Sequence, residues 1–339
     1  MSFVSGAEGS DGPVRLNHAL GNLPSTTDVD PAALAALAAA LRESAGDGLV
    51  RDRLLAPMTS WQIGGPADLY LEPPSVESLS MARQLAVEFA VPVTIIGGGS
   101  NILVSDAGVR GLVLRLAKAF DFRNWQDLGE AEAVVEVGAA TRFIRLAKET
   151  VEESYAGLEF AAGIPGSVGG AVRMNAGAFG GEIADTFESM IVVDGNGNVR
   201  EALRTELEFS YRKLALPVDD MITSVRFRLR RSSRGRLREV IASVQAKRRR
   251  GQPAGLPNAG SVFKNPGAEY AGKLIERAGL KGRAIGQAQV SEDHANFIVN
   301  LGGATARNVQ DLMSCVQEEV WRSGGVWLEP EVRFVGDWR

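Results

Sequence analysis

The pattern of apolar and polar positions predicts a chain in which helices and strands alternate. Residues 31–44 are rich in strong helix formers behind Pro31, and residues 75–90 follow a capping Ser75, so both stretches are expected to be helices. Further helices are predicted over 141–154, 237–250, 270–280 and 305–325. Strands are predicted over 67–74, 91–96, 111–116, 131–140, 221–231 and 326–336. Such alternation is typical of α/β and α+β folds.

Three local patterns add detail. Residues 190–202 indicate a hairpin, because Asp194 to Gly197 have the composition of a tight turn. Residues 157–182 fit neither the helix nor the strand period and are expected to form a long loop punctuated by glycine, a kind of loop that is often functional. The last expected helix ends near Gly324. Its apolar stripe consists of Val309, Leu312, Met313, Val316 and Val320.

Composition then narrows the functional classes. The chain has 339 residues with 41 acidic and 37 basic side chains, which gives no electrostatic reason to expect nucleic acid as a partner. One cysteine, Cys315, and two histidines, His18 and His294, are too few for a disulfide framework or a zinc site of the usual ligand sets, so no metal is expected. The sequence has no apolar stretch long enough to span a membrane and no signal-peptide pattern, so we expect a cytoplasmic protein.

The stretch VPVTIIGGGSNILV places three glycines, residues 97–99, directly after an expected strand. A Rossmann dinucleotide fingerprint would have its third glycine at position 102, followed by a helix, whereas Ile102 stands there and strand-like residues follow. The Rossmann interpretation is therefore disfavoured. Open N–H groups, together with Ser100 and Asn101, favour a nest for a pyrophosphate. The alternative is a tight turn between paired strands.

A second glycine-rich stretch, AAGIPGSVGGAVRMNAGAFGGE, covers residues 161–182. Its small side chains would let a planar ring lie against the backbone. The alternative is a packed loop in which two backbones approach closely. Two separate glycine-rich stretches suit a large ligand that is held at both ends.

Short polar motifs supply candidate reactive groups. Arg212, next to Tyr211, could clamp a carboxylate, and the alternative is a surface arginine. Ser261 follows Ala-Gly, and Lys264 and Asn265 behind it could bind an anion or an amide. This serine has no visible general base and is a weak nucleophile, but it could pass a proton if a cofactor performed the difficult step. The alternative is a turn serine ahead of a helix.

Two charged stretches also have two interpretations each. Glu329, Glu331 and Arg333 stand at every second position, so a regular strand would place them on one face. A buried acid there could polarise a substrate or relay a proton, whereas the alternative is a solvated face. Lys247 to Arg250 form a cationic helix end. These residues either complement the helix dipole or contact phosphates at the mouth of a site.

Six stretches that occur in order resemble one family: TSWQIGGPA, IIGGGSNILV, GLEFAAGIPGSVGGAVRMNAGAFGGE, FSYRKL, NAGSVFKNP and WLEPEVRF. From about Leu54 to Gly336 the chain is similar to the UDP-N-acetylenolpyruvoylglucosamine reductase (MurB) family. The resemblance implies an α+β protein with an FAD-binding domain of the vanillyl-alcohol-oxidase/p-cresol-methylhydroxylase type and a C-terminal α+β substrate-binding domain. The expected parts are a mobile N-terminal extension (1–30), a helix and lead-in (31–60), the FAD-binding domain (61–230) and the substrate-binding domain (231–339).

The resemblance also implies a reaction. NADPH reduces FAD, and hydride then passes to UDP-N-acetylglucosamine-enolpyruvate, which gives UDP-N-acetylmuramate for peptidoglycan synthesis. The implied catalytic residues are Ser261, as proton donor, and Arg212 and Glu331, which stabilise the intermediate. The implied substrate contacts are Tyr211, Lys264, Asn265 and Glu276. The implied FAD contacts are Gly97, Gly98, Gly99, Ser100, Asn101, Ile102, Ala162, Gly163, Ile164, Pro165, Gly166, Ser167, Gly169, Gly170, Asn175, Gly177, Ala178 and Ile222.

Two departures from family patterns qualify this expectation. Some members carry an insertion with a tyrosine that covers the substrate, but only 48 residues without a tyrosine separate Arg212 from Ser261 here, which predicts the shorter subtype. Some relatives in the wider flavin superfamily attach FAD through histidine, and neither glycine-rich stretch contains one, so FAD is expected to be non-covalent. We expect a monomer. The alternatives are another flavoprotein of the same fold that uses oxygen, and a nucleotide-binding module without activity.

Overall fold

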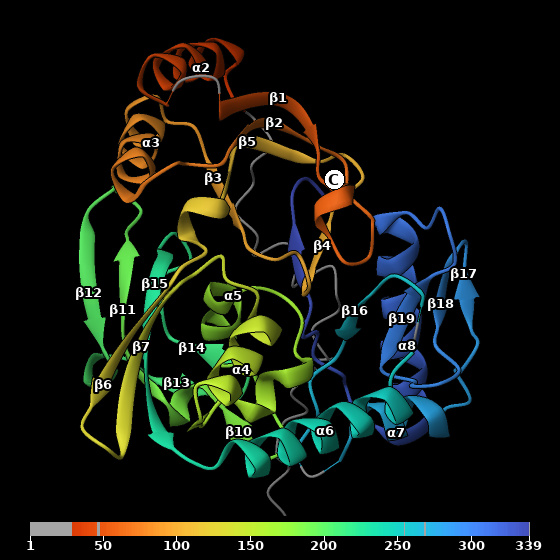
Figure 1. Cartoon of the computed structure of the whole chain (residues 1–339). Helices are drawn as coiled ribbons and strands as arrows, with labels where there is room; N and C mark the ends of the chain where they lie inside the picture. Colours follow the sequence, from red (N-terminus) through yellow and green to blue (C-terminus); the bar gives the residue numbers. More distant parts are fainter. Residues whose placement is uncertain (1–28, 46–47, 254, 268, 339) are drawn as a thin grey trace, which may run out of the picture.

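The computed structural model describes residues 29–45, 48–253, 255–267 and 269–338. Its helices and strands form three units, which lie at the top, at the lower left and at the right of Figure 1. The first two units come from the N-terminal two thirds of the chain, and the third unit comes from the C-terminal part. The expected N-terminal extension lies almost entirely outside the described residues.

The first unit is a four-stranded sheet of order β1-β2-β5-β3, with two helices on one face. The strands β2, β5 and β3 are parallel, and β1 pairs antiparallel with β2. Leu37 and Leu41 of α2 and Leu79 of α3 are buried against the sheet, and the Ser75 hydroxyl caps α3 as the sequence predicts. The elements are α2 (Pro31–Ala45), β1 (Leu49–Leu54), η2 (Ala56–Met58), β2 (Pro66–Leu71), α3 (Val76–Glu88), β3 (Val93–Ile96), β4 (Ile102–Val104) and β5 (Val109–Arg115).

The second unit is a larger antiparallel sheet of order β12-β11-β15-β7-β6, with β8 also paired to β15. The hairpin predicted around Asp194 and the long strand predicted over 221–231 are both confirmed. Phe143, Phe160 and Phe227 lie in the core between the sheet and its helices. The elements are η3 (Lys118–Phe120), β6 (Arg123–Leu128), β7 (Glu132–Gly138), α4 (Phe143–Glu152), β8 (Tyr155–Ala156), η4 (Glu159–Gly163), α5 (Val168–Arg173), β9 (Gly177–Ala178), β10 (Gly181–Glu182), η5 (Ile183–Asp185), β11 (Phe187–Val193), β12 (Val199–Leu203), η6 (Arg204–Glu206), β13 (Phe209–Ser210), β14 (Lys213–Leu214) and β15 (Met221–Arg231).

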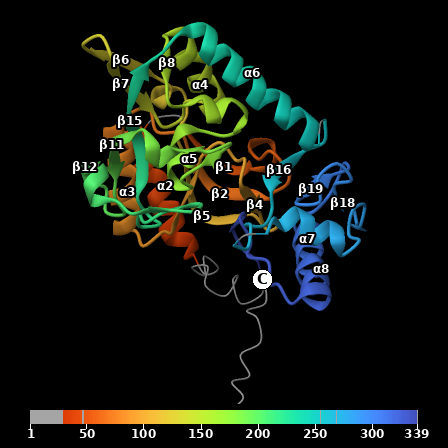
Figure 2. The same cartoon turned by 90° about the horizontal axis from the view of Figure 1, so that it is seen from below.

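Helix α6 (Arg234–Gly251) runs along the outside of the molecule from the second unit towards β16, as the view from below in Figure 2 shows. Its buried residues, Leu237, Ile241 and Val244, belong to the core of the second unit. The proposed division of the chain at residue 231 stays a prediction, and the packing of α6 favours a division behind this helix.

The third unit has a four-stranded sheet of order β16-β19-β18-β17 and two helices. All five residues of the predicted apolar stripe on the last helix are buried, and the helix ends at Gly324 as predicted, with Gly325 (φ 66°) as its C-cap. Trp61, from the first unit, is buried in this third core and donates from Nε1 to the Ile298 carbonyl (2.8 Å). The elements are β16 (Asn258–Ser261), α7 (Ala271–Arg277), β17 (Ala284–Ile285), β18 (Ala288–Val290), β19 (Phe297–Asn300), α8 (Ala306–Gly324) and β20 (Arg333–Val335).

Two predictions of secondary structure were wrong. The strand expected over 326–336 is confined to β20, because Pro330 has no N–H for a ladder and pairs only through an isolated bridge with Phe263. The loop expected over 157–182 contains the helix α5, whose first turn is capped by the Ser167 hydroxyl. Glycines within α5 lower its intrinsic helix propensity and hid it from the sequence pattern.

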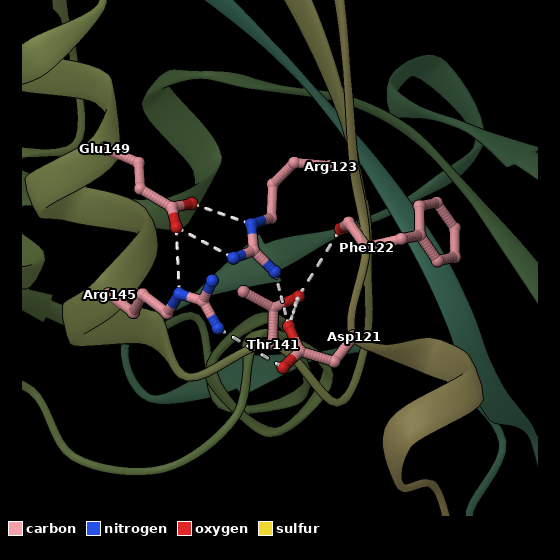
Figure 3. Close-up of polar contacts among 6 residues, drawn as sticks. All are labelled: Asp121, Phe122, Arg123, Thr141, Arg145 and Glu149. Carbon is pink, nitrogen blue, oxygen red and sulfur yellow. Dashed lines mark hydrogen bonds and ion pairs between the residues drawn. The ribbon is translucent and has the colours of Figure 1, made fainter.

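A network of ion pairs and hydrogen bonds joins Asp121 and Arg123, at the start of β6, to helix α4 (Figure 3). Arg123 donates to both carboxylate oxygens of Glu149 (2.7 Å each), and Arg145 donates to the same carboxylate (2.9 Å). Asp121 accepts from Arg123 and from the Thr141 hydroxyl (3.1 Å). The main-chain oxygen of Thr141 in turn accepts from the first N–H of α5 (2.9 Å). The network therefore fixes the backbone edge against which the second glycine-rich stretch packs.

Asp106, on the loop between β4 and β5, should stabilise the contact between the first and third units. Its carboxylate accepts from the N–H groups of Ala306 (2.8 Å) and Arg307 (3.1 Å) at the start of α8. Asp106→Ala is expected to lower the free energy of unfolding by about 1–2 kcal/mol, measured by thermal and urea unfolding. Asp311→Ala, which removes only an exposed ion pair with Arg307 on the same helix, is the control. Equal losses in the two variants would contradict the stabilising role of Asp106.

Candidate functional site

The two glycine-rich stretches, far apart in the sequence, lie directly against each other. A Cβ on Gly98 would stand 2.7 Å from the Gly166 Cα and 2.8 Å from the Ser167 nitrogen. A Cβ on Gly97 would come within 3.0 Å of the Ser167 hydroxyl oxygen. No side chain fits at position 98 unless the backbone moves, so this close approach depends on glycine. The two backbones thus form one continuous cradle.

Two further contacts fix the first glycine loop. Gly99 has φ 67°, and a Cβ there would collide with the Met58 carbonyl oxygen, while its own carbonyl accepts from the Ser60 nitrogen (2.9 Å). The Ser100 hydroxyl lies 3.4 Å from the Pro165 carbonyl that accepts its hydrogen bond. The loop is therefore rigid, and its conformation is set mainly by backbone contacts.

The C-terminal strand lies beside the same loop. The Asn101 side chain donates to the Glu331 carbonyl (3.0 Å), and the Arg333 nitrogen donates to the Asn101 carbonyl (3.1 Å). From Ile102 onward β4 pairs in parallel with β20. Asn101 thus connects the first glycine loop to the segment that carries a predicted catalytic glutamate.

The side chain of Asn175, a predicted FAD contact, makes its hydrogen bonds to the protein backbone. It is fully buried with φ 40°, its side-chain nitrogen donates to the Ser210 carbonyl (3.0 Å), and its side-chain oxygen accepts from the Ala184 nitrogen (3.1 Å). Both ends of the amide are therefore engaged by the protein. The contact with Ser210 positions the turn that follows, which carries Tyr211 and Arg212.

Other residues predicted to contact the cofactor lie on four elements, α5, β9, β15 and η4. Gly169, in α5, packs against Ala139. A Cβ on this glycine would lie 2.9 Å from the Ala139 Cβ. Gly177 and Ala178 form β9, and Ile222 is a buried residue of β15. Ala162, Gly163 and Ile164 lie at the end of η4, where the Ile164 nitrogen donates to the Ala161 carbonyl (2.9 Å). The structure gathers these residues around α5, and their contacts with FAD stay predictions.

Arg212 and Glu331, which the sequence separates by more than a hundred residues, form an ion pair. Arg212 lies in the turn between β13 and β14 with φ 57°, and its Nε is 3.1 Å from Glu331 Oε1. The side chains are only 23% and 17% exposed, so solvent screens the pair weakly. Burial raises the pKa of Glu331, and the charges of Arg212 and Lys264 oppose this rise.

The segment that contains Ser261 lies beside this pair. The Glu331 nitrogen donates to the Val262 carbonyl (2.9 Å), and the Lys264 nitrogen donates to the Glu329 carbonyl (2.9 Å). Ser261, the last residue of β16, is therefore adjacent to a backbone contact with the buried glutamate. The side chains of Glu329 and Glu331 have different partners, since Glu329 pairs with Lys264.

Two residues predicted to contact substrate have other partners in this structure. The Asn265 side-chain oxygen accepts from the Ala271 nitrogen (3.0 Å) and so caps α7. Glu276 pairs with Lys281 (2.7 Å) on the exposed side of the same helix. Tyr211 is half exposed, and the Arg212 guanidinium lies 5.0 Å from its ring centroid.

Two partly buried arginines, Arg173 and Arg248, were not identified individually from the sequence. Arg173, at the end of α5, donates to the carbonyls of Leu216 (3.1 Å), Pro217 (2.7 Å) and Asp220, and burial lowers its pKa to about 10. Arg248, on α6, lies against Gly163. In the sequence Arg248 is one of four adjacent cations, and no local feature distinguishes it from its neighbours.

Within the described part of the chain, no group of three or more His, Cys, Asp or Glu side chains could hold a metal ion. No helix there is both long and apolar enough to cross a membrane.

Two family models match the chain. Residues 67–203 match an FAD binding domain, and residues 252–335 match the C-terminal domain of UDP-N-acetylenolpyruvoylglucosamine reductase. UDP-N-acetylenolpyruvoylglucosamine reductase from Gloeobacter violaceus is 45% identical over 83% of this chain and 94% of its own length. The Myxococcus xanthus enzyme of the same name is 43% identical over 89% of this chain and 97% of its own length. The chain belongs to the UDP-N-acetylenolpyruvoylglucosamine reductase family.

A solved structure agrees with this assignment. The crystal structure of UDP-N-acetylenolpyruvylglucosamine reductase (MurB) from Thermus caldophilus has a TM-score of 0.73 and 39% identity, over 85% of this chain and 98% of that chain. The predicted α+β fold, with an FAD-binding domain of the vanillyl-alcohol-oxidase/p-cresol-methylhydroxylase type and a C-terminal domain of the MurB family, is confirmed. The predicted enzyme class, an FAD-dependent UDP-N-acetylmuramate dehydrogenase of peptidoglycan synthesis, is confirmed as well.

The cradle fits FAD by its chemistry. Glycines at positions 97, 98 and 166 let the two loops pack directly against each other, and the N–H groups of such glycine-rich turns bind phosphate oxygens. Strand β4 follows the first loop, so a nest of N–H groups and no helix dipole would hold the pyrophosphate there.

Gly98→Ala is expected to weaken FAD binding at least about tenfold, because a Cβ at this position forces the two halves of the cradle apart. FAD fluorescence titration of the folded apoprotein measures the effect. Gly235→Ala, in the first turn of α6 where a Cβ meets open space, is the control and should bind FAD normally. Normal FAD affinity in the Gly98 variant would contradict the proposed cradle.

Arg212→Met should make stability depend more strongly on pH. Burial raises the pKa of Glu331 above its ordinary value of 4.5, and the positive charge of Arg212 opposes this rise. Without Arg212 the pKa of Glu331 is expected to rise further. The Glu331 carboxyl loses its proton at a lower pH in the unfolded chain than in the folded chain. The free energy of unfolding therefore falls as pH rises from the unfolded pKa to the folded pKa. We expect the free energy of unfolding to fall by about 2 kcal/mol at pH 7, which is less than for a fully buried pair, and to change little below pH 4.

Urea unfolding at both pH values measures this effect. The double variant Arg212→Met/Glu331→Gln should recover most of the loss at pH 7, because no buried carboxylate is then left without its partner. Equal losses at the two pH values would show that the arginine stabilises only by packing.

Proposed function

We propose that the protein uses NADPH to reduce the enolpyruvyl group of UDP-N-acetylglucosamine-enolpyruvate to UDP-N-acetylmuramate. The observation that carries the proposal is the Arg212–Glu331 pair, which lies between the glycine cradle and the segment that contains Ser261. The relatives named above support it, because each is named as a UDP-N-acetylenolpyruvoylglucosamine reductase. Bound FAD would supply the hydride that is added to the double bond.

Arg212 is proposed to bind the carboxylate of the enolpyruvyl group. Hydride addition to the double bond sends negative charge into that carboxylate, so a fixed guanidinium stabilises the intermediate more than the substrate. Glu331 holds the guanidinium through the contact at 3.1 Å, and it leaves other N–H groups of Arg212 to face the ligand. The positive φ of Arg212 is a strained conformation for a residue with a side chain, and it supports a functional reason for this geometry.

Ser261 is proposed to donate the proton that completes the reduction. A hydroxyl is a weak acid in water, but an enolate-like intermediate is a strong base, and a fixed donor avoids the cost of reorganisation. Gly260, with φ 77°, precedes this serine and lets the backbone turn there. Glu331, whose raised pKa brings its carboxyl nearer to neutrality, is suited to relay protons between ligand and solvent.

Tyr211, Lys264, Asn265 and Glu276 remain the proposed substrate contacts. The exposed face of Tyr211 and the cation of Lys264 suit a pyrophosphate, and Lys264 must first leave its pair with Glu329. The Asn265 nitrogen remains available because only its side-chain oxygen caps α7. Membership of the shorter subtype, non-covalent FAD, a monomeric state and a cytoplasmic location are parts of the same proposal.

The two half-reactions test the proposal directly. In stopped-flow experiments without oxygen, NADPH should bleach the flavin absorbance, and UDP-N-acetylglucosamine-enolpyruvate should restore it. Ser261→Ala should leave the first phase unchanged and slow the second at least about a hundredfold, as expected for loss of a proton donor.

The outcomes separate the alternatives. Bleaching without recovery on the sugar nucleotide would contradict the proposed substrate, and rapid recovery on oxygen alone would favour an oxidase. Equal slowing of both phases by Ser261→Ala would contradict the proton-donor role.

A further inference from the structure

Asn296 lies directly before β19 and is buried, with 2% of its surface exposed, against the segment that follows Ser261. Its side-chain oxygen accepts from the Phe263 nitrogen (3.0 Å), and its side-chain nitrogen donates to the Phe263 carbonyl (2.8 Å). Its main-chain oxygen accepts from the Val262 nitrogen (2.9 Å). Asn296 therefore holds the two residues behind Ser261 by three hydrogen bonds.

The sheet itself stops short of these two residues. The pairing of β16 with β19 contains a register shift before Ser261, and Gly260, with φ 77°, lies within it. Ser261 pairs with Phe297, and β16 ends there. An amide side chain offers the same donor and acceptor as a peptide group. The side chain of Asn296 therefore extends the pairing beyond the end of the strand.

The main-chain groups of this segment alternate between two partners. The Val262 carbonyl accepts from the Glu331 nitrogen, and the Lys264 nitrogen donates to a carbonyl of the same C-terminal segment (2.9 Å each). Both main-chain groups of Phe263, which lies between them, bond to Asn296. The three residues behind the proposed proton donor are thus fixed between Asn296 and the segment that carries Glu331.

The turn before β19 holds Asn296 in its own place. The Ser291 hydroxyl accepts from the nitrogens of Asp293 (3.2 Å) and His294 (3.4 Å), and the Phe297 nitrogen donates to the His294 carbonyl (2.9 Å). The Asn296 nitrogen donates to His294 Nδ1 (3.2 Å). The amide that contacts the segment behind Ser261 is therefore carried by a turn that is closed by its own hydrogen bonds.

The main chain decides where the hydroxyl of Ser261 lies. Among the described residues, none hydrogen-bonds to this hydroxyl. Without the Asn296 amide, the N–H and carbonyl of Phe263 would be left unpaired in a buried region, and the segment would shift to regain partners. A shift of a reacting group by about 1 Å can slow a step about a hundredfold.

We propose that Asn296 is a positioning residue for proton transfer from Ser261. It acts through the main chain of Val262 and Phe263 and holds the serine in a fixed place relative to Glu331. The proposal rests on the proton-donor role of Ser261 proposed above. It predicts that loss of the Asn296 amide slows the step that uses the proton and spares the reduction of the flavin.

Asn300, at the other end of β19, is the matched control. It is also a buried asparagine, with 5% of its surface exposed. Its side-chain nitrogen donates to the Trp61 carbonyl (2.9 Å), and its side-chain oxygen accepts from the nitrogens of Gly302 (2.9 Å) and Ala304 (3.0 Å). None of these partners belongs to residues 261–264. Removal of either amide leaves buried main-chain groups unpaired, but only Asn296 contacts the segment behind the proton donor.

The test compares Asn296→Ala with Asn300→Ala in the two half-reactions of the holoenzyme, without oxygen. NADPH should bleach the flavin at the wild-type rate in both variants, because this phase uses no proton from Ser261. With saturating UDP-N-acetylglucosamine-enolpyruvate, the absorbance should return at least about tenfold more slowly in Asn296→Ala and at the wild-type rate in Asn300→Ala. The double variant Ser261→Ala/Asn296→Ala should be no slower than Ser261→Ala, because the hydroxyl to be positioned is already absent.

Each contrary result has a distinct meaning. Equal slowing in the two asparagine variants, or a double variant slower than Ser261→Ala by the full factor of Asn296→Ala, would overturn the positioning role. A normal second phase in Asn296→Ala, beside a slow one in Ser261→Ala, would overturn the positioning role alone. A normal second phase in Ser261→Ala would overturn the proton-donor role on which it rests. If the alanine variants did not fold, Asn296→Ser and Asn300→Ser, which leave less empty volume, would be compared by the same criteria.

Discussion

The site depends on one close approach of two backbones, that of Gly98 to Gly166 and Ser167. It joins a loop of the first sheet to a loop of the second unit, and it does so through backbone alone, which is possible because residues 98 and 166 are glycines. The charge network around Arg123 and Glu149 supports the backbone edge behind the second loop. The Gly99 contact with Met58 and Ser60 supports the first loop.

Main-chain pairing brings the proposed catalytic residues to this cradle. Strand β20 lies parallel to β4, Asn101 donates to the Glu331 carbonyl, and Glu331 in turn pairs through its backbone with Val262. One short C-terminal segment therefore contacts both the cofactor loop and the segment with Ser261. Asp106 and Trp61 add contacts between the same units at α8 and β19.

Cations dominate the inside of the site. Arg212 is matched by Glu331 and Lys264 by Glu329, whereas Arg173 is satisfied by backbone carbonyls and Arg248 has no partner among the described residues. Such a surplus of buried positive charge is costly in the free protein and favourable once anions bind. It suits a cofactor with a pyrophosphate and a sugar nucleotide that carries a carboxylate and a pyrophosphate.

Elements with strong local signals were predictable from the amino-acid sequence alone: the capped helix α3, the hairpin at Asp194, the strand β15 and the apolar stripe of α8. The order of six motifs also determined the family, and the missing glycine at position 102 argued against a Rossmann site. Local pattern failed at α5, where glycines mask a helix, and at residues 326–332, where Pro330 prevents a regular strand. Only the tertiary structure paired Arg212 with Glu331 and distinguished Arg248 from three neighbouring cations. The physical reason is that burial and charge partners are properties of contacts between distant segments, which local sequence patterns do not contain.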